Sequence, residues 1–280
     1  SSDLSLKDIN GNIGPTKVSG SGEITGLDAK TAEGEKRGFD FNLALDDVPV
    51  EQFMEATVDN GAADEDWGNW SKDPMELAVM NDYDGRATIT ADSIVYDKYN
   101  FESPRFDAVL KDGVLNITNF TGKLFGGDVA IAGNFSSAGD LDMDMSIKNA
   151  AIVDATTSFA GIEPISGYFD MNQKIIGKGT SQEALISSLT GTGQVTATPG
   201  IIHGINLPEL NERLKGLDNQ NGLLGLLAST LSGGETPYEG GASTMTMENG
   251  ALKLSPLDIK MLGAQSIVNL GIDLAEWNMD

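Results

Sequence analysis

Apolar and polar residues alternate with a period of two along much of this chain, and this pattern limits its fold more than any other feature. In the segment 114–135, Leu115 and Ile117 alternate with polar residues, a glycine turn follows, and Val129 and Ile131 resume the alternation. Successive side chains of a strand point to opposite faces of a sheet. The pattern therefore predicts strands with one apolar and one polar face.

The same alternation recurs at residues 41–46, 106–110, 141–147, 257–261 and 268–274. Short turns containing Asp-Gly or Asn-Gly separate several of these runs, as is typical of hairpins. Short connections and half-polar faces favour an antiparallel meander over parallel βαβ units. We expect a mainly β protein.

A few short helices should interrupt the strands. The segment 181–189 follows Thr180, which with Glu183 matches a capping box. The segment 207–217 follows Asn206, a residue type that caps helices well. A third candidate is 48–56, where a proline fits the first helical turn.

The chain has 280 residues, of which 40% are hydrophobic, so it can bury a sizeable core. Its 34 glycines and 6% aromatic residues suit short strands and turns. We predict an N-terminal β segment at 1–100, with an acidic loop at 59–85, and a C-terminal β region at 101–280.

The formal net charge of −24 repels phosphate backbones and anionic membranes, which argues against nucleic-acid binding. The chain has no cysteine, so disulfides and thiolate chemistry are excluded. No apolar run approaches the roughly 18 residues of a membrane-spanning helix. Because the sequence begins with Ser1 and stops in mid-pattern, we expect a processed or cut chain whose membrane anchor lies outside it.

Candidate catalytic and metal-binding motifs are weak. His203 is the single histidine, and no G-x-S-x-G elbow or complete phosphate-binding glycine loop accompanies it. Asp140, Asp142 and Asp144 share one strand face, and burying three like charges would be costly, so that face should be wet. We therefore predict no catalytic residue, no metal site and no cofactor.

One acidic stretch leaves a different function open. Asp64, Glu65 and Asp66 stand beside Trp67 and Trp70, and such a set could bind a carbohydrate or a cation. A solvated loop explains the same residues.

The apolar strand faces must be covered, since burying one large apolar side chain is worth roughly 1.5–3 kcal/mol. A second sheet, the helices, or an apolar ligand held in a curled sheet could each cover them. Energetics alone leave these alternatives open.

A family resemblance bears on that choice. The run "FDAVLKDGVLNITNFTGKLFGGDVAIAGNF" and the run "GKGTSQEALISSLTGTGQVTATPGIIHGINLPEL" resemble the C-terminal region of the AsmA family of bacterial envelope proteins. The family pattern places "sLtGtG" before a strand and "Gi-(D/N)l" before a helix, matched here by Ser188–Gly193 and by Gly204 to Leu207. The resemblance covers roughly residues 100–275.

The resemblance implies a periplasmic part of an inner-membrane-anchored protein, related to TamB-like lipid-transfer proteins whose curled sheets form hydrophobic grooves. It implies an elongated, curled antiparallel sheet, either an open groove or a partly closed barrel, and a role in phospholipid transport and outer-membrane homeostasis. No catalytic residues are known for the family, so none carries over. The partners implied are phospholipid acyl chains, with outer-membrane proteins or other envelope proteins as further candidates.

Eight apolar residues on the alternating strands are the expected lipid-contacting wall: Leu115, Ile117, Val129, Ile131, Leu141, Met143, Met145 and Ile147. Two alternatives remain for these residues and this chain. The wall could be an ordinary closed core, and the protein could be a scaffold that assists outer-membrane protein assembly by strand addition at a sheet edge.

Overall fold

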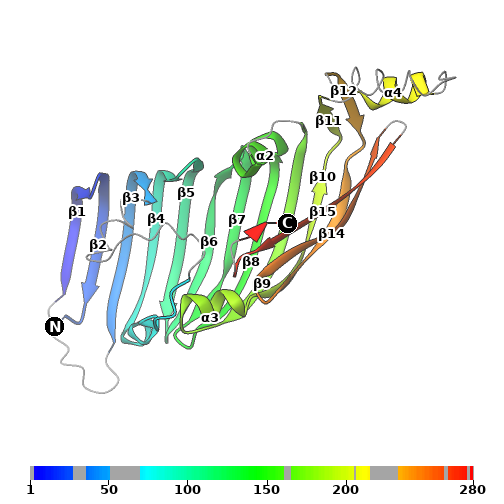
Figure 1. Ribbon diagram of the computed structural model, residues 1–280. Helices are drawn as coiled ribbons and strands as arrows, with labels where there is room; N and C mark the ends of the chain where they lie inside the picture. The colour runs from blue at the N-terminus through cyan, green and yellow to red at the C-terminus, as the bar shows by residue number, and fades with distance from the viewer. Residues whose placement is uncertain are drawn as a thin grey trace, which may run out of the picture.

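The computed structural model describes residues 3–27, 36–50, 70–160, 165–204, 206–214, 233–261, 264–275 and 278–279. Within these ranges one long sheet contains all sixteen strands, with a few short helices at its borders, of which α4 projects away from the sheet beyond β11 and β12 (Figure 1). The strands are β1 (Leu4–Ile13), β2 (Thr16–Thr25), β3 (Arg37–Pro49), β4 (Tyr83–Tyr96), β5 (Tyr99–Lys111), β6 (Val114–Leu124), β7 (Gly127–Ser136), β8 (Asp140–Ala151), β9 (Tyr168–Lys178), β10 (Thr190–Ala197), β11 (Gly200–His203), β12 (Glu235–Tyr238), β13 (Gly241–Glu248), β14 (Ala251–Met261), β15 (Ala264–Asp273) and β16 (Asn278–Met279). The helices are η1 (Leu77–Asp82), α2 (Ile152–Ala160), α3 (Gln182–Ser187) and α4 (Leu207–Leu214).

The strands follow one another as a meander from β1 to β10, after which β13, β14 and β15 extend the sheet. Almost every neighbouring pair is antiparallel, which confirms the expected topology. The exception is β3 and β4, which run parallel. A parallel pair needs a crossover connection, and the long stretch between Pro49 and Tyr83 supplies one.

Direct cross-strand pairing sorts the side chains into two faces. Residues paired across neighbouring strands lie on the same face, and one such row runs from β3 to β8 through Leu43, Ile89, Phe106, Phe120, Ile131 and Met145. We call this side the apolar face. The residues that alternate with them in the sequence form the opposite side, which we call the polar face; examples are Asp40, Arg86 and Asp107. The period-two pattern thus gives the sheet two chemically different faces.

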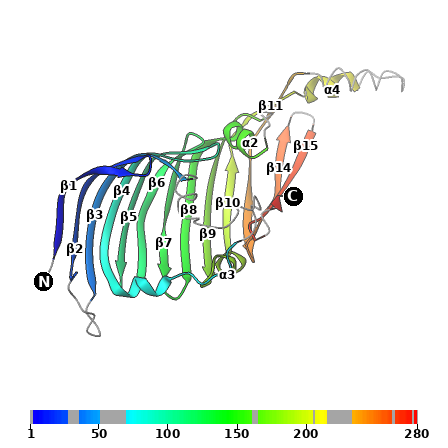
Figure 2. The same cartoon turned by 60° about the vertical axis from the view of Figure 1, so that its left-hand side comes forward.

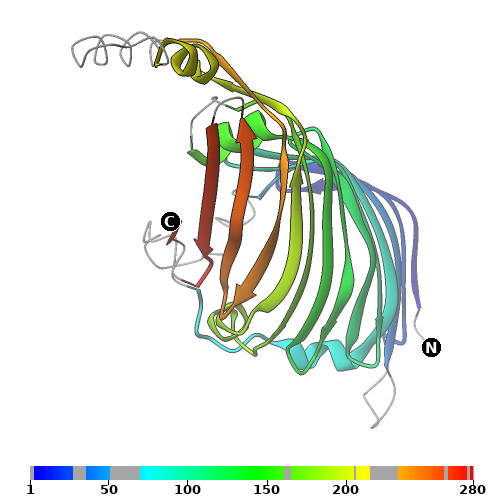
Figure 3. The same ribbon diagram turned by 90° about the vertical axis from the view of Figure 1, so that its right-hand side faces the viewer.

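The sheet is curled and does not close into a barrel, as expected. Figure 3 shows the strands bowed into a curve, and Figure 2 shows the same curvature from another side. The helix α3 lies on the inner side of the curve, and side-chain atoms of Leu185 and Leu189 approach the site of Gly177 on β9. Gly177 pairs with Leu141, so the inner, concave side is the apolar face.

Bulges interrupt the register at several points and keep the apolar residues on one face. In β6 the pairing with β7 shifts between Ile117 and Phe120, and in β8 the pairing with β9 shifts between Ile147 and Ala150. Each extra residue increases the local twist and bends the strand. These shifts contribute to the curl that alternation alone does not specify.

Two of the expected helices form, with corrections at their ends. The N-cap of α3 is Ser181, whose Oγ accepts a hydrogen bond from the backbone N–H of Ala184 at 3.1 Å, so the prediction of Thr180 as the cap was wrong. The carbonyl of Thr180 instead accepts from the N–H of Met75 at 2.7 Å, which holds that residue outside the helix.

Asn206 caps α4 as expected, because its Oδ1 accepts from the N–H of Glu209 at 3.0 Å. The helix is described to Leu214, and residues 215–217 of the expected segment lie outside the described residues. So does most of the third candidate, 48–56, of which 48–50 are described and Pro49 ends β3.

The helix α2 is one that the sequence did not predict. Its first half contains the β-branched Ile152 and Val153, which have low helix propensity. The N–H of Ile152 donates to the carbonyl of Gly167 at 3.0 Å, so a contact from a distant part of the chain fixes the helix start. Tertiary structure here overrides a weak local preference.

Residues 70–82 run beneath the lower ends of the strands (cyan in Figure 1). The indole N–H of Trp70 donates to the carbonyl of Leu274 at 2.6 Å, and the N–H of Glu183 in α3 donates to the carbonyl of Ser71 at 3.1 Å. Farther along, the hydroxyl of Ser137 donates to Asn81 Oδ1 at 3.0 Å. This segment links β15, α3 and the turn after β7, so much of the predicted acidic loop 59–85 is an ordered connection; residues 59–69 lie outside the described residues.

Candidate functional site

All eight predicted wall residues lie on the apolar face, on the three consecutive strands β6, β7 and β8. Direct pairing joins Ile131 with Met145 and Val129 with Ile147, and it joins Leu115 to Leu141 through Phe135. Ile117 and Met143 meet on either side of Gly133. The structure thus brings the predicted residues together into one continuous apolar surface on the concave side.

This surface is not sealed inside a core. Val129 is buried at 6% exposure, whereas the other seven residues are partly exposed. Within the described residues, the cluster of buried apolar side chains that packs as a core centres on Tyr238 and Ile259, near the far end of the sheet. The interior expected of a closed sandwich is therefore not found in this part of the protein.

The apolar face extends well beyond the eight residues that the sequence singled out. Toward the N-terminus it includes Phe39, Phe41 and Leu43 of β3, where the rings of Phe39 and Phe41 stack at 5.8 Å between centroids. Next to the predicted wall, Phe120 lies 5.2 Å from Phe101 and 6.0 Å from Phe106.

Toward the C-terminus the apolar face continues through β9, β10 and β13. The residues on these strands are Met171, Ile175, Val195, Met245 and Met247. The alternation in the sequence had predicted strands at 41–46 and 106–110, and it had singled out none of these five residues. Only the strand register shows that they share a face with the predicted wall.

A polar side chain interrupts the apolar face in β9. Gln173 pairs directly with Met145 on one side and Gly193 on the other, and it is 5% exposed. Its Nε2 donates to the carbonyl of Lys174 at 3.2 Å, and its Oε1 has no hydrogen-bond partner. Sequence reasoning passed over this residue, because a glutamine between Met171 and Ile175 gives no motif.

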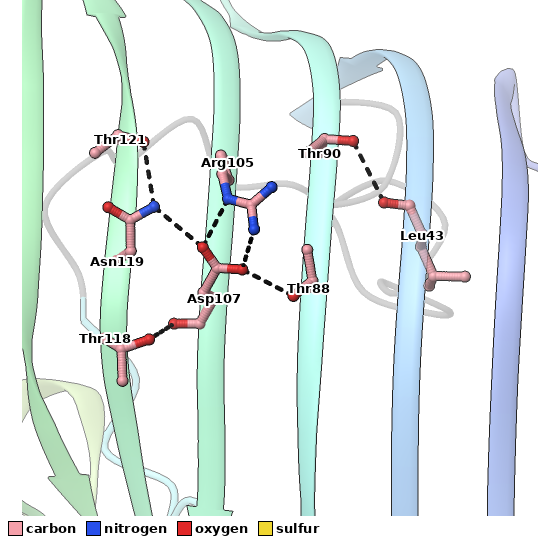
Figure 4. Close-up of polar contacts among 8 residues, drawn as sticks. All are labelled: Leu43, Thr88, Thr90, Arg105, Asp107, Thr118, Asn119 and Thr121. Carbon is pink, nitrogen blue, oxygen red and sulfur yellow. Dashed lines mark hydrogen bonds and ion pairs between the residues drawn. The ribbon is translucent and has the colours of Figure 1, made fainter.

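The polar face carries a hydrogen-bond network around Asp107 of β5 (Figure 4). Arg105 donates to both carboxylate oxygens at 2.7 and 2.8 Å, and Thr88 and Asn119 of the flanking strands donate at 2.8 and 3.1 Å. The bonds from Arg105 first, and then those from Thr88 and Asn119, hold the pKa of the Asp107 carboxyl below its ordinary value. This carboxylate is satisfied by its neighbours and ties three strands together.

The row of Asp140, Asp142 and Asp144 is solvent-exposed, as predicted. Lys178 pairs with Asp140 at 2.6 Å, and Lys174 pairs with Asp142 at 2.5 Å. The bond from Lys178 holds the pKa of Asp140 below its ordinary value. Cross-strand ion pairs thus offset part of the repulsion along this strand.

Open depressions of about 490 and 450 Å³ also lie on the polar face. The first is lined by Asn119, Asp144 and Lys174 among others, and the second by Asn10, Lys17 and Asp46 among others. Both depressions are open and are lined by polar and apolar atoms together. The continuous apolar surface lies on the opposite face of the sheet.

The other candidate residues do not converge on a site in the described structure. His203 ends β11 with a half-exposed side chain, 3.6 Å from a carboxylate oxygen of Glu235. Among the residues that the structure describes, no three histidine or acidic side chains cluster as metal ligands would. Trp70 uses its indole N–H to hold Leu274, while Asp64, Glu65, Asp66 and Trp67 lie outside the described residues.

A sequence model of the AsmA family matches residues 41–257. The chain belongs to the AsmA family. The match covers most of the chain and begins earlier than the resemblance to residues 100–275 suggested, so strands β3 and β4 share the family pattern with the strands that follow. No curated protein and no solved structure matches the chain significantly.

AsmA membership supports a role associated with the bacterial cell envelope. None of the helices in the described ranges is long and apolar enough to cross a membrane. Over the described residues, this AsmA chain forms a curled sheet whose concave face is apolar and whose convex face is polar.

Proposed function

We propose that this AsmA protein is a non-catalytic periplasmic module that holds phospholipid acyl chains against the apolar face of its sheet, and that a segment beyond this sequence tethers it to the inner membrane. Transport of phospholipid between the membranes of the envelope would use this face as a conduit. The observation that carries the proposal is the continuous apolar surface from β3 to β13 on the concave side, over whose predicted wall the described residues form no packed core.

The energetics of such a surface favour an apolar occupant. Each methylene group that leaves water for an apolar surface contributes about 0.8 kcal/mol, so an acyl chain along several strands gains a large free energy without directed bonds. Methionines such as Met143 and Met145 have flexible side chains that adapt to chains of different shape. The polar face, with its ion pairs and aspartates, keeps the outside of the sheet in water.

Mass spectrometry of organic extracts from the purified protein tests the proposal. The chain should be produced in the periplasm of a bacterium with an outer membrane, and we expect phospholipid to copurify at near-stoichiometric amounts. In the double variant Ile131→Glu, Met145→Glu the two charges on the apolar face should lower bound phospholipid at least tenfold, because a carboxylate beside an acyl chain loses its hydration.

The control is Ala130→Glu, Ala132→Glu, which adds the same charges to exposed positions of β7 on the polar face. This variant should retain its lipid, and circular dichroism should show native strand content for both. Absence of lipid from the unaltered protein would contradict the proposal. Loss of folding in the Ile131→Glu, Met145→Glu variant alone would instead indicate a closed core.

A second function, assistance to outer-membrane protein assembly, is favoured by one observation. Among the described strands β1 pairs only with β2, so its other edge is open, and its apolar residues Leu4, Leu6 and Ile13 are exposed. An unfolded barrel protein could add a strand there. Capture of an unfolded outer-membrane protein by a lipid-free preparation, lost in a variant with proline at Asn10 and Asn12, would support this function.

A further inference from the structure

Gln173 places an unsatisfied hydrogen-bond acceptor in the middle of the apolar face. The residue is 5% exposed, and its Oε1 has no partner. Leaving a buried acceptor unpaired is unfavourable, while a methionine of similar shape would avoid that cost. The position therefore carries a cost that packing alone does not explain.

The side chains next to Gln173 along the face are apolar. Met171 and Ile175 flank Gln173 along β9, and Met145 lies opposite it on β8. On β10 the opposite position is Gly193, and a Cβ atom there would collide with Gln173 Oε1. The missing side chain at Gly193 thus makes the space in which the amide lies.

We infer that Gln173 Oε1 accepts a hydrogen bond from a hydroxyl group carried within an acyl chain on the apolar face. This inference rests on the proposed function and names the class of chain: a hydroxylated acyl chain.

The chemistry of the acceptor narrows the ligand to this class. Ester, ketone and phosphate oxygens carry no hydrogen to donate, so they cannot satisfy Oε1. An ammonium headgroup would bring an unpaired charge among methionines and an isoleucine, which is strongly unfavourable. A hydroxyl with methylene groups on both sides matches both the acceptor and the apolar residues around it.

For a ligand to reach the oxygen, the side chains that neighbour Gln173 on the face would have to move. Met145 and Met171 have flexible, unbranched side chains that can shift when a chain binds. A water molecule is a poor substitute, since a buried water usually needs two to four polar partners and the side chains next to Gln173 on this face are apolar.

A series of three fatty acids of equal length tests the inference. Stearate, 12-hydroxystearate and 12-oxostearate should be used to displace a fluorescent naphthylamine probe from delipidated protein at neutral pH. We expect 12-hydroxystearate to bind about tenfold more tightly than stearate, and 12-oxostearate to bind no more tightly than stearate.

The variant Gln173→Met removes the acceptor and keeps the shape of the side chain. It should bind stearate at least as well as the unaltered protein and should lose the preference for the hydroxylated chain. The matched control is Gln194→Met, the same substitution on exposed β10 at the polar face, which should leave the tenfold preference intact.

The outcomes separate the inference from the proposed function. If none of the three fatty acids displaces the probe, the proposed function fails and the inference fails with it. If stearate and 12-hydroxystearate bind the unaltered protein equally well, the lipid-binding face stands and the role of Gln173 is overturned. Because the fatty-acid series needs no variant, this result holds even if Gln173→Met does not fold.

Discussion

The carboxylate of Asp107 shows how single residues hold neighbouring strands in register. It accepts hydrogen bonds from Thr88 on β4, Arg105 on β5 and Asn119 on β6, and its side chain is 21% exposed. Hydrogen bonds to a charged, partly buried group are stronger than those at the surface. The register between these strands decides which side chains share the apolar face, so this polar residue supports the candidate site from the opposite side of the sheet.

We expect Asp107→Asn to lower the free energy of unfolding by about 1 kcal/mol at pH 7, since the neutral amide loses the ion pair with Arg105. The folded protein holds the pKa of Asp107 below its ordinary value, so its stabilisation is present at pH 7 and is lost as the pH falls below about 4. Urea titrations of both proteins at pH 7 and near pH 3 measure the difference.

Asp128→Asn is the control, because Asp128 is paired with Lys123 on the same face but its side chain is 74% exposed. No measurable change in the unfolding midpoint is expected for it at either pH. A loss of stability in Asp107→Asn that persists unchanged at pH 3 would show that the carboxylate charge is not its source.

At the scale of elements, α3 depends on a close approach to the sheet. Gly179 follows β9, and a Cβ atom there would collide with the backbone N of Leu185 in α3. Leu185 and Leu189 then cover the site of Gly177, where a side chain would also collide. Two glycines at the end of one strand therefore let this short helix lie directly on the apolar face.

The substitution Gly179→Ala should destabilise the protein by about 2 kcal/mol, because α3 must move away from β9 and its contacts are lost. Gly11→Ala on β1 is the matched control, since nothing lies within 4 Å of a Cβ atom at that position. Its effect should stay within about 0.5 kcal/mol. Thermal unfolding followed by circular dichroism compares the two variants, and equal midpoints would contradict this account of α3.

At the scale of the whole molecule, the described residues form a ladder of strands rather than a layer packed on a second layer. Each strand contacts chiefly its immediate neighbours, and the segment 70–82 joins distant parts of the sheet along one border. Such an arrangement distributes stability along one dimension, as in repeat proteins. The stability of the sheet is then spread over many strand pairs, and the acyl chains of the proposed function would supply the cover that the apolar face needs.

Amide hydrogen exchange should therefore vary along the sheet. The edge strand β1 pairs with one described neighbour, and we expect its amides to exchange at least 100-fold faster than those of β7 and β8, which are paired on both sides. Exchange followed by mass spectrometry of peptides measures this difference. Equal protection of β1 and β8 would indicate a single cooperative unit instead.

Local pattern determined the strands and helix α4, because their signals lie within a few residues of one another. Alternation predicted the strands that carry Leu115, Val129 and Met145, and a capping residue predicted α4. The start of α2 has a hydrogen bond to Gly167, and Thr180 before α3 accepts one from Met75; both partners are distant in the sequence. No local pattern carries that information.

The sequence by itself determined that the chain forms ribbons with one apolar side, and that the aspartates of β8 face water, since the side-chain period of a strand and the cost of buried charge are local physics. Only the tertiary structure decided that these apolar sides join into one concave face, that this face is not covered by a second sheet in the described part of the chain, and that Gln173 lies within it. These three features depend on strand register, on the bulges and on the curvature of the sheet. They follow from the sum of many pairings between strands and from no single segment.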